Sequence, residues 1–372
     1  MAPTRVGIIG LKAVVQDHYS PGTWGLQHLK ALSASPNYDI VAVCNTSVES
    51  AQESIQVHNL NAKAYGNVED LAANPDIDMV LVCVDVGQRS KLLKPVLLSK
   101  KHAYIEFPAG NRAAEVIELA DLAERQGVKV VVGAQGRADP AFARMRKFIA
   151  EGEIGDIVST TMTGFIPIIT ADGWPHVQTA FLDVDSGISR ARGVLGHILD
   201  NYTSVVGDFE QVQSALKVQD KVAKTLDANN NIVDPAYPTT SPDTMFIQGI
   251  LKNGALASLN LRSARSAVDD TGFRWTISGT KGELELTSPP GIMSFPPGFK
   301  VRIRRLGADT EDVEFGGEEP EHISSLPAPA ANVGGVWEAF HQGDGERALS
   351  IREAVKVHEL LEKIIDHGIY AP

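Results

Sequence analysis

Basic residues, cysteines and long apolar runs are all scarce in this chain, and each shortage excludes a class of protein. The 46 acidic residues outnumber the 34 basic ones, for a formal net charge of −12. This argues against direct nucleic-acid binding, which needs a basic patch. The only two cysteines, Cys44 and Cys83, lie in apolar strand-like runs, which indicates buried thiols in a reducing compartment.

No stretch of the sequence is long and apolar enough to span a bilayer, and residues 1–5 contain no apolar signal core. We therefore expect a soluble, cytoplasmic protein with no membrane partner, no nucleic-acid partner and no metal site.

With 372 residues, 43% of them hydrophobic, the chain is too long to fold around one ordinary hydrophobic core. We expect two domains. Residues 1–137 would form a dinucleotide-binding α/β domain, and residues 138–372 an α+β domain for substrate binding and dimerisation.

The first third of the chain alternates apolar strand patterns with helical patterns. This alternation predicts a doubly wound parallel sheet with right-handed crossovers. The predicted strands are 5–10, 38–45, 79–84, 102–107 and 128–134, and the predicted helices are 24–34, 47–58, 88–99 and 112–126.

After Gln135 the pattern changes. Asp139-Pro140 predicts a helix start, with Asp139 as the cap, and long β-type runs follow this helix. These runs predict a mostly antiparallel open sheet, interrupted by a helix over 192–206 and closed by a helix over 350–367. The predicted strand regions are 156–166, 209–219, 244–264, 273–287 and 300–305, and the Pro- and Gly-rich stretches 288–299 and 316–332 are predicted loops.

The strand over 5–10 ends at Gly10, as a buried strand does when it enters a tight turn. In dinucleotide-binding units that turn holds the pyrophosphate against the next helix. The glycine pattern is incomplete here, because Lys12 stands two residues after Gly10 and the third glycine position falls near Val15. A plain strand-to-helix turn is the alternative interpretation.

Four segments together resemble the Gfo/Idh/MocA oxidoreductases: Val6 to Gly10, Tyr104 to Pro108, Gly193 to Asp200 and Gly279 to Gly282. Other segments resemble the branch of the fungal galactose-regulon repressor; these are residues 10–13, 135–137, 153–157 and 246–249. The resemblance covers nearly the whole chain. It implies an N-terminal Rossmann domain and a C-terminal open sheet that commonly builds a homodimer.

The resemblance places a catalytic lysine of the family at position 107, where this chain has Phe107. Phenylalanine can neither donate nor accept a proton, so its side chain would only pack there. Glu106 keeps the family residue and is expected to contact the cofactor, and a cis bond before Pro108 is left open.

By the same resemblance His197 matches the family's catalytic histidine, and Gly193 replaces its aspartate. An imidazole near a carboxylate can act as a general acid or base near neutral pH. We predict His197, Asp200 and Tyr202 as catalytic residues, with Asp200 orienting His197 and Tyr202 as a rival donor. A structural histidine at a helix–sheet interface is the alternative.

Gln135 and Arg137 follow the last parallel strand, at the sheet edge where ligands bind. Arg137 would meet an anionic substrate or the cofactor, or instead form a structural ion pair. Residues 174–176 would lie in a loop of the substrate wall or cover the core. The predicted cofactor-binding residues are Gly7, Gly10, Leu11, Lys12, Ala13, Asn45, Thr46, Ser47, Val84, Val86, Glu106, Phe107, Gln135 and Arg137.

The choice between NAD and NADP is made at the end of the second strand. Asn45-Thr46-Ser47 offers neither the carboxylate that suits NAD nor the arginine that suits NADP, so both remain open. Thr46 and Ser47 could bond ribose or phosphate, and Ser47 could equally cap a helix.

Three functions follow from these observations. The first is an NAD(P)-dependent oxidoreductase acting on a small-molecule carbonyl or hydroxyl, with altered acid–base residues. The second is a non-catalytic nucleotide-binding regulator that acts through a protein partner. The third is a redox-neutral isomerase or lyase. We favour the oxidoreductase.

Overall fold

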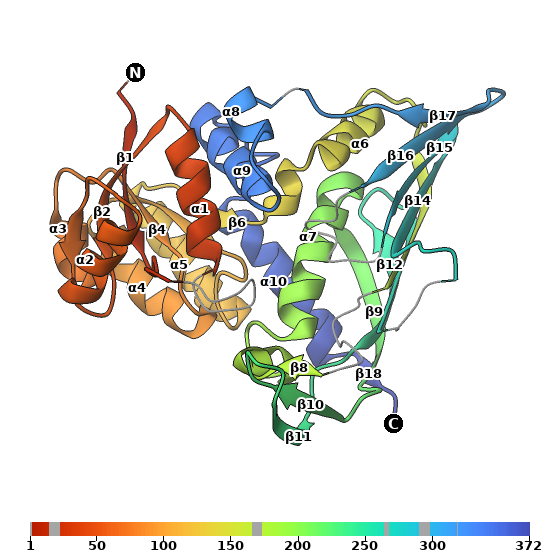
Figure 1. Cartoon of the computed structure of the whole chain (residues 1–372). Coiled ribbons are helices and arrows are strands. Elements are labelled where there is room, and N and C mark those ends of the chain that lie inside the picture. Colours follow the sequence, from red (N-terminus) through yellow and green to blue (C-terminus); the bar gives the residue numbers. More distant parts are fainter. Residues whose placement is uncertain (1, 15–22, 166–172, 264–267, 290–297, 318) are drawn as a thin grey trace. The chain divides into compact units, whose positions relative to one another are not determined.

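A computed structural model describes residues 2–14, 23–165, 173–263, 268–289, 298–317 and 319–372. The chain forms two compact units, shown in Figure 1. The first holds Met1–Ala138 with Glu319–His358, and the second holds Asp139–Glu318 with Glu359–Pro372. The chain thus returns to the first unit near its end, whereas the sequence pattern placed residues 319–358 in the second domain.

The first unit contains a six-stranded parallel sheet in the order β3-β2-β1-β4-β5-β6, and this confirms the doubly wound fold. Its strands are β1 (Thr4–Ile9), β2 (Tyr38–Cys44), β3 (Lys63–Tyr65), β4 (Met79–Val82), β5 (His102–Glu106) and β6 (Val130–Gly133). Its early helices are α1 (Thr23–Ala34), α2 (Val48–Val57), α3 (Val68–Ala73), α4 (Val86–Leu98) and α5 (Ala113–Gln126).

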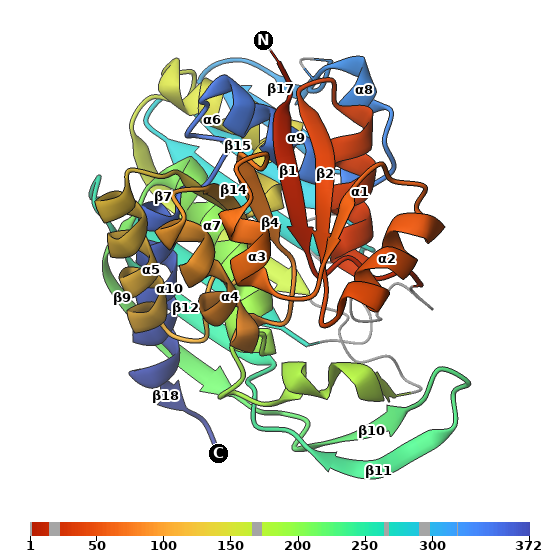
Figure 2. The same cartoon turned by 90° about the vertical axis from the view of Figure 1, so that its left-hand side faces the viewer.

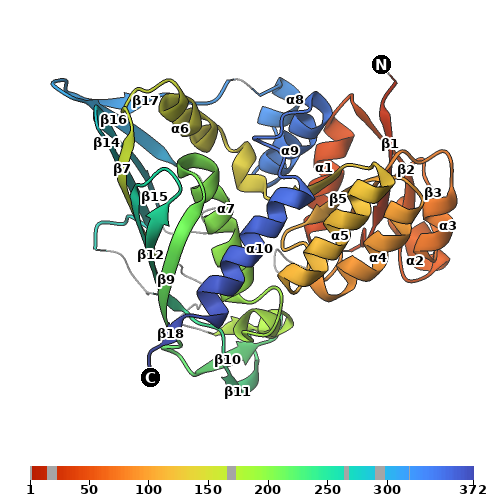
Figure 3. The ribbon, with the colours of Figure 1, turned by 180° about the vertical axis from the view of Figure 1, so that it is seen from behind.

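Helices cover both faces of this sheet, so its central strand β4 is apolar throughout. All four residues of β4 are buried, as expected for a strand between two helical layers. Helices α4 and α5 lie side by side in Figure 3. The sequence pattern did not predict β3 and α3, because three- and six-residue elements are too short to show a period.

The segment that returns to the first unit forms α8 (Glu321–Ser324), α9 (Ala330–Gln342) and the first part of α10 (Ile351–Asp366). Helix α9 packs beside α1 (Figure 1). The Tyr38 hydroxyl donates to the Trp337 carbonyl at 2.7 Å. A Cβ at Gly334 would come within 2.8 Å of Ile323, and one at Gly335 within 2.9 Å of Ala138, so the two glycines permit α9 to pack closely on α8 and on the turn after β6. The prediction of a loop over 316–332 is therefore wrong in part, because α8 lies inside this stretch and α9 begins before the stretch ends.

The second unit is built on a nine-stranded sheet in the order β17-β16-β15-β14-β7-β13-β12-β9-β18. The pairing is antiparallel except for β13 with β7 and β18 with β9, which confirms a mostly antiparallel sheet. Its strands are β7 (Ile157–Phe165), β9 (Phe209–Lys217), β12 (Thr244–Leu251), β13 (Leu256–Arg262), β14 (Phe273–Gly279), β15 (Gly282–Ser288), β16 (Lys300–Arg305), β17 (Thr310–Val313) and β18 (Ile369–Tyr370).

Helices α6 (Pro140–Ala150) and α7 (Leu195–Val206) lie on one face of this sheet (Figure 1). Asp139 caps α6 as predicted, since its side chain accepts from the Ala141 N–H. The core on that face contains Trp275, whose indole N–H donates to the Thr160 hydroxyl at 2.8 Å. The alternating apolar pattern of the strands aims one side chain in two at these helices.

A small sheet, β11-β10-β8, forms the extended ribbon in Figure 2. It joins β8 (Trp174–Pro175), β10 (Val222–Leu226) and β11 (Ile232–Pro238). Trp174 is buried, and its indole N–H donates to the Gln178 carbonyl at 2.8 Å. Of the two interpretations of residues 174–176, the structure favours the one in which they cover the core, because Trp174 belongs to the core of this small sheet.

Parts of several sequence expectations lie outside the described residues, namely the turn from residue 15 to 22, residue 166, residue 264 and positions 290–297. Within the described part, no helix is both long and apolar enough to cross a membrane.

Candidate functional site

The turn after β1 requires glycine at position 10. Gly10 has φ +96, and a Cβ there would lie 2.4 Å from the Cys83 carbonyl oxygen. Its own N–H donates to the Cys44 carbonyl at 3.0 Å. The end of β1 is therefore wedged between the ends of β2 and β4, where only glycine fits.

Helix α1 begins against this turn. A Cβ on Gly25 would lie 3.4 Å from the Gly10 carbonyl oxygen, so Gly25 allows the helix to approach the strand closely. The family pattern would place the glycine with this role near Val15. The N-terminal N–H groups of a helix carry partial positive charge and favour phosphate. The turn and the start of α1 thus have the layout of a pyrophosphate site.

The residues after Gly10 differ in burial and therefore in how they could contact a ligand. Leu11 is fully buried, and its carbonyl accepts hydrogen bonds from the Asn45 amide and the Ser54 hydroxyl, both at 2.8 Å. Lys12 is exposed and Ala13 partly buried. Leu11 therefore acts through its backbone, while Lys12 has a side chain accessible to a phosphate.

Gly7 was predicted to bind the cofactor, and the structure contradicts this. It lies inside β1, where it pairs with Ala42 and Val80, and a Cβ there would come within 3.3 Å of Leu71. Gly7 therefore serves the packing of α3 on the sheet, and it lies three residues before the ligand edge.

The end of β2 supplies one accessible candidate. The Asn45 amide is engaged with Leu11 and Ser54, at 2.8 Å and 3.1 Å. Ser47 caps α2 by accepting from the Ser50 N–H at 3.2 Å. Thr46 is exposed. Of the three predicted residues, Thr46 alone has an exposed side chain for a ribose or phosphate.

A buried arginine that the sequence did not single out connects the ends of β4 and β5. The Arg89 guanidinium donates to the carbonyls of Val84 at 2.8 Å and Glu106 at 3.0 Å, and also to that of Pro108. Burial lowers the pKa of Arg89. Val84 and the buried Val86 therefore belong to a turn that is fixed from beneath by this cation.

Glu106 lies in a buried network rather than at an open edge. Its carboxylate accepts from His28 Nε2 at 2.6 Å and from the Gln135 amide at 2.9 Å, and the residue is only 3% exposed. The indole N–H of Trp337 donates to His28 Nδ1 at 2.9 Å. Because an indole nitrogen can only donate, the His28 proton lies on Nε2 and points to Glu106.

This environment sets the ionisation of Glu106. Burial alone would raise the pKa of its carboxyl, but the hydrogen bonds from His28 and Gln135, with the charge of Arg89, bring that pKa below its ordinary value. The carboxylate thus accepts hydrogen bonds from the protein's own donors, and the contact of Glu106 with the cofactor stays a prediction. His28 carries a sequence signal, since it occupies the buried stripe of α1 with Gly25 and Leu32.

Phe107 is 3% exposed and packs against the ring of His358, with ring centroids 5.2 Å apart. The bond from Phe107 to Pro108 is cis. The position that resembles the family's catalytic lysine is therefore filled by an apolar ring beside a histidine of α10, which the sequence pattern did not indicate.

Gln135 and Arg137 lie in a short 3-10 turn after β6. Gln135 is fully buried, and its Oε1 has no hydrogen-bond partner among the described residues. The Arg137 guanidinium lies 4.0 Å from the Glu353 carboxylate. The ion-pair interpretation of Arg137 is therefore the one that this contact favours.

In the second unit, α7 carries the three predicted catalytic residues, which differ in their exposure to solvent. His197 is partly exposed, whereas Asp200 and Tyr202 are fully buried. Five residues along an α-helix turn the side chain about 140° away, so Tyr202 faces the sheet and not the side of His197. Its ring stacks on Trp275 with centroids 5.1 Å apart.

Burial raises the pKa of the Tyr202 hydroxyl well above its ordinary value. Tyr202 is therefore a core residue, and its prediction as a rival proton donor is wrong. Asp200 lies one turn from His197 and keeps its predicted role as a proposal.

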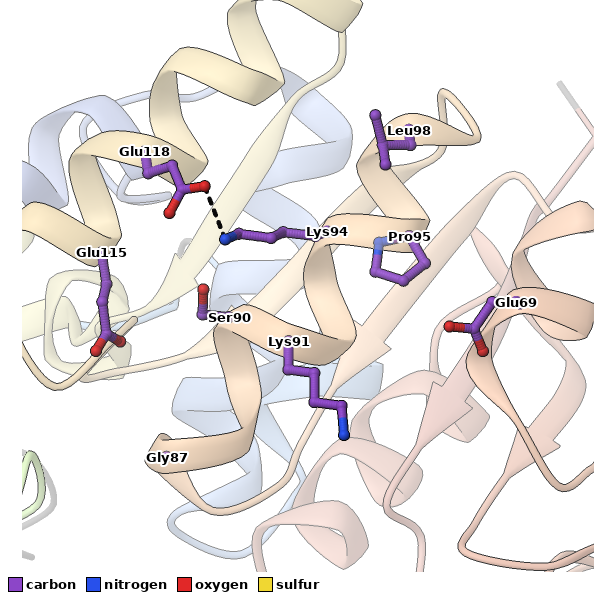
Figure 4. A pocket seen from close by; sticks show the side chains of 9 residues that line it. All are labelled: Glu69, Gly87, Ser90, Lys91, Lys94, Pro95, Leu98, Glu115 and Glu118. Atoms are coloured by element: carbon purple, nitrogen blue, oxygen red, sulfur yellow. Dashed lines mark ion pairs between the residues drawn. The ribbon is translucent and has the colours of Figure 1, made fainter.

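A groove of about 700 Å³ lies on the outer side of α4, between α3 and α5 (Figure 4). Its charges balance in part within the groove, as in the ion pair of Lys94 with Glu118 at 2.7 Å. None of the predicted site residues lines it. Among the described residues, no cluster of His, Cys, Asp and Glu could hold a metal ion.

Two family models match successive parts of the chain. Residues 4–134 match the Gfo/Idh/MocA oxidoreductase family with its NAD-binding Rossmann fold, and residues 140–288 match the C-terminal domain of Gal80p. The N-terminal part of the chain thus matches the Rossmann domain of the Gfo/Idh/MocA oxidoreductases, and the part that follows matches a domain of Gal80p.

The proteins to which this chain is similar include a dehydrogenase and regulatory proteins. The chain is 26% identical to dehydrogenase aclE of Aspergillus oryzae, over 97% of this chain and 95% of that protein. It is also 26% identical to the galactose/lactose metabolism regulatory protein GAL80 of Kluyveromyces lactis, over 78% of this chain and 65% of that protein.

Two solved structures share the fold over nearly the whole chain. A super-repressor mutant of Gal80p from Saccharomyces cerevisiae has a TM-score of 0.84 at 21% identity, over 98% of this chain and 95% of that one. Levoglucosan dehydrogenase in complex with NADH and levoglucosan has a TM-score of 0.77 at 18% identity, over 98% and 96%. These two likenesses show that the fold is shared.

Proposed function

We propose that the protein is an NAD(P)-dependent oxidoreductase that transfers hydride to or from a small-molecule carbonyl or hydroxyl. The observation that carries this proposal is the β1 turn, in which Gly10 and Gly25 bring the strand end against the start of α1. The likeness to a dehydrogenase over 97% of the chain supports it.

The residues of the first unit fit a nicotinamide dinucleotide. The turn from Gly10 to Ala13 and the start of α1 would hold the pyrophosphate, and Thr46 would meet the ribose. The Gln135 Oε1, a buried acceptor without a hydrogen-bond partner among the described residues, suits an amide N–H of the ligand. When bound, the dinucleotide supplies or takes the hydride.

The chain's own contribution to the chemistry is a proton transfer. We propose that His197 takes the proton from the oxygen of the substrate hydroxyl as the hydride leaves the carbon that bears this oxygen, and that it returns the proton to the oxygen in the reduction. Asp200 would orient the imidazole. Phe107 has no group that could transfer a proton.

Calorimetry tests the first half of this proposal. We expect the wild-type protein to bind at least one of NAD, NADH, NADP and NADPH at the first unit. The absence of binding by all four at millimolar concentration would remove the oxidoreductase proposal. The cofactor preference is left to this titration, because the end of β2 carries no residue that decides it.

A non-catalytic regulator is the second candidate, and a specific observation favours it. The lysine position of the family holds the buried Phe107, and the match to the Gal80p C-terminal domain covers residues 140–288. Such a protein would bind the dinucleotide and a protein partner without turnover.

Phe107→Lys tests whether position 107 belongs to a redox site. We expect this variant to gain dehydrogenase activity, because the amine stands where the resemblance places the family's proton-transfer lysine. A steady-state assay of reduced nicotinamide measures the gain. Phe107→Leu, which keeps an apolar side chain, should show none; equal activity of the two variants contradicts this role of position 107.

The exposed face of the large sheet is proposed to form a homodimer. Phe246 and Ile250 of β12 and Leu256 of β13 are 49%, 38% and 62% exposed, and Ile250 pairs with Leu256. Neighbouring exposed apolar side chains favour burial against a partner, and a second copy would bury the same patch on both sides.

We expect light scattering to give a dimer mass for the wild type at micromolar concentration. Phe246→Glu should shift it toward the monomer, because a dimer would bury the new charge. Thr310→Glu on the edge strand β17 serves as the control and should remain dimeric. A monomeric wild type contradicts the proposal.

A further inference from the structure

Arg190 is a buried cation with few partners. It begins the π-helical turn Arg190–Val194 that leads into α7, and it is only 2% exposed. One guanidinium nitrogen, Nη2, donates to the Ser241 carbonyl at 2.6 Å. Nε and Nη1 are buried and have no hydrogen-bond partner in the described part of the chain. Arginine remains charged in proteins, so these donors cannot be removed by deprotonation.

The neighbouring carboxylates do not compensate Arg190 directly. Asp243 attracts it through space, but its carboxylate already accepts from the N–H groups of Gln219 at 3.1 Å and Asp220 at 3.0 Å, and from the Thr244 hydroxyl at 3.1 Å. Burial is the main cause that lowers the pKa of Arg190. A buried charge without a hydrogen-bonded counterion is costly for the free protein.

The geometry of the guanidinium leaves one complete binding edge. The two hydrogens of Nη2 point to different edges, one shared with Nε and the other with Nη1. The Ser241 carbonyl occupies one of them. The other edge keeps two parallel N–H donors, the arrangement that matches the two oxygens of a carboxylate.

A second unpartnered group lies on the segment that meets Arg190. Thr239, two residues before Ser241, is 6% exposed, and its hydroxyl has no hydrogen-bond partner among the described residues. The Ser241 hydroxyl in turn accepts from the Ala191 N–H at 3.3 Å. The segment 239–243 thus holds the arginine in place and adds an unused hydroxyl, and both features point to a missing polar ligand.

We propose that Arg190 anchors a carboxylate of the substrate, so that the substrate class is a hydroxy acid or keto acid. The substrate assignment rests on the proposed oxidoreductase function. Arg190 precedes His197 by seven residues, about two helical turns or ~10 Å along the axis. An arginine side chain and a short carbon chain together span that distance. The carboxylate only binds; the hydride and proton leave the carbinol group.

Carboxylate-dependent stabilisation tests this anchor without any turnover. Gluconate and glycolate should raise the melting temperature of the wild type by about 2–4 °C over sodium chloride of equal ionic strength. Arg190→Met should abolish this rise, and Arg190→Lys, which keeps the charge but loses the binding edge, should reduce it.

Arg192→Met is the matched control. Arg192 is also buried, but it donates to the Asp366 carboxylate and to the Val184 carbonyl, both at 3.3 Å. This variant should melt at a lower temperature and keep the full carboxylate response. If Arg190→Met fails to fold, Arg190→Lys against Arg192→Met decides the question.

A wild type that responds to carboxylates no more than to chloride overturns the proposal, and so does a full response in Arg190→Lys or Arg190→Met. Dinucleotide calorimetry on the same samples separates the two ideas. Dinucleotide binding without a carboxylate response removes the anchor and keeps the oxidoreductase. A response that depends on Arg190 without dinucleotide binding removes the oxidoreductase and keeps the anion site.

Discussion

Replacing Glu106 with leucine is expected to lower the free energy of unfolding by about 3–5 kcal/mol, the usual result of removing one partner from a buried charged network. The Glu106 carboxylate accepts from His28 and Gln135. Its charge also faces the buried Arg89. Leucine would leave that cation without its counterion and two polar side chains without an acceptor. Chemical denaturation measures the loss.

Glu118→Leu provides the control for this experiment. Its carboxylate pairs with Lys94 at 2.7 Å, but the Glu118 side chain is 59% exposed. Exposed ion pairs contribute about 0–1 kcal/mol, so this variant should unfold nearly as the wild type does. If the two variants lose the same free energy of unfolding, Glu106 contributes no more to stability than an exposed carboxylate does.

The same network predicts a pH dependence. Because the pKa of Glu106 is lowered in the folded protein, its stabilising contribution is fully present above its unfolded pKa, about 4.3. That contribution falls as the pH drops through the folded value. The difference in the free energy of unfolding between wild type and Glu106→Gln should therefore be constant from about pH 6 to about 5. It should become smaller below about pH 4.3. A gap that widens on acidification contradicts the assigned direction.

His197→Ala is expected to reduce turnover by about 10²–10⁴-fold, the usual contribution of a general acid or base. His197 is the partly exposed member of the three predicted catalytic residues on α7. The affinity for the dinucleotide should remain nearly unchanged, because the residues proposed to bind it belong to the first unit. Steady-state kinetics and calorimetry on the same preparation separate the two effects.

Ser204→Ala is the matched control on α7. Its hydroxyl donates to the Asn201 carbonyl of the same helix at 2.8 Å, so its loss changes no more than a local hydrogen bond. Turnover should stay close to that of the wild type. If His197→Ala also leaves turnover unchanged, the substrate proton goes to water or to a group other than His197.

The order of strands and helices in the first unit could be predicted because each long element carries its own period. Continuous apolar runs give the buried strands, and 3.6-residue stripes give the helices between them. Helix α9 could not be found in this way, since Gly334 and Gly335 obscure its period and the helix it packs against, α1, lies far away in the sequence. Packing between distant segments leaves little trace in a local pattern.

The site was predictable in part for the same reason. Gly10 could be found because a strand followed by a tight turn is a local signal. Glu106 was placed at the correct strand end, but its partners His28, Arg89 and Gln135 come from three other elements, so its burial could not be foreseen. Tyr202 follows His197 by five residues, so the period of an α-helix alone would have placed the two side chains on different faces.

Cofactor-dependent turnover is the measurement that tests the central proposal most directly. A panel of hydroxy acids, polyols and their carbonyl forms would be incubated with wild-type protein and each nicotinamide cofactor, and the reduced nicotinamide followed by absorbance. The oxidoreductase proposal predicts turnover with at least one compound, lost in His197→Ala. Dinucleotide binding without turnover of any compound, together with binding of a protein partner, would contradict it and identify a regulator.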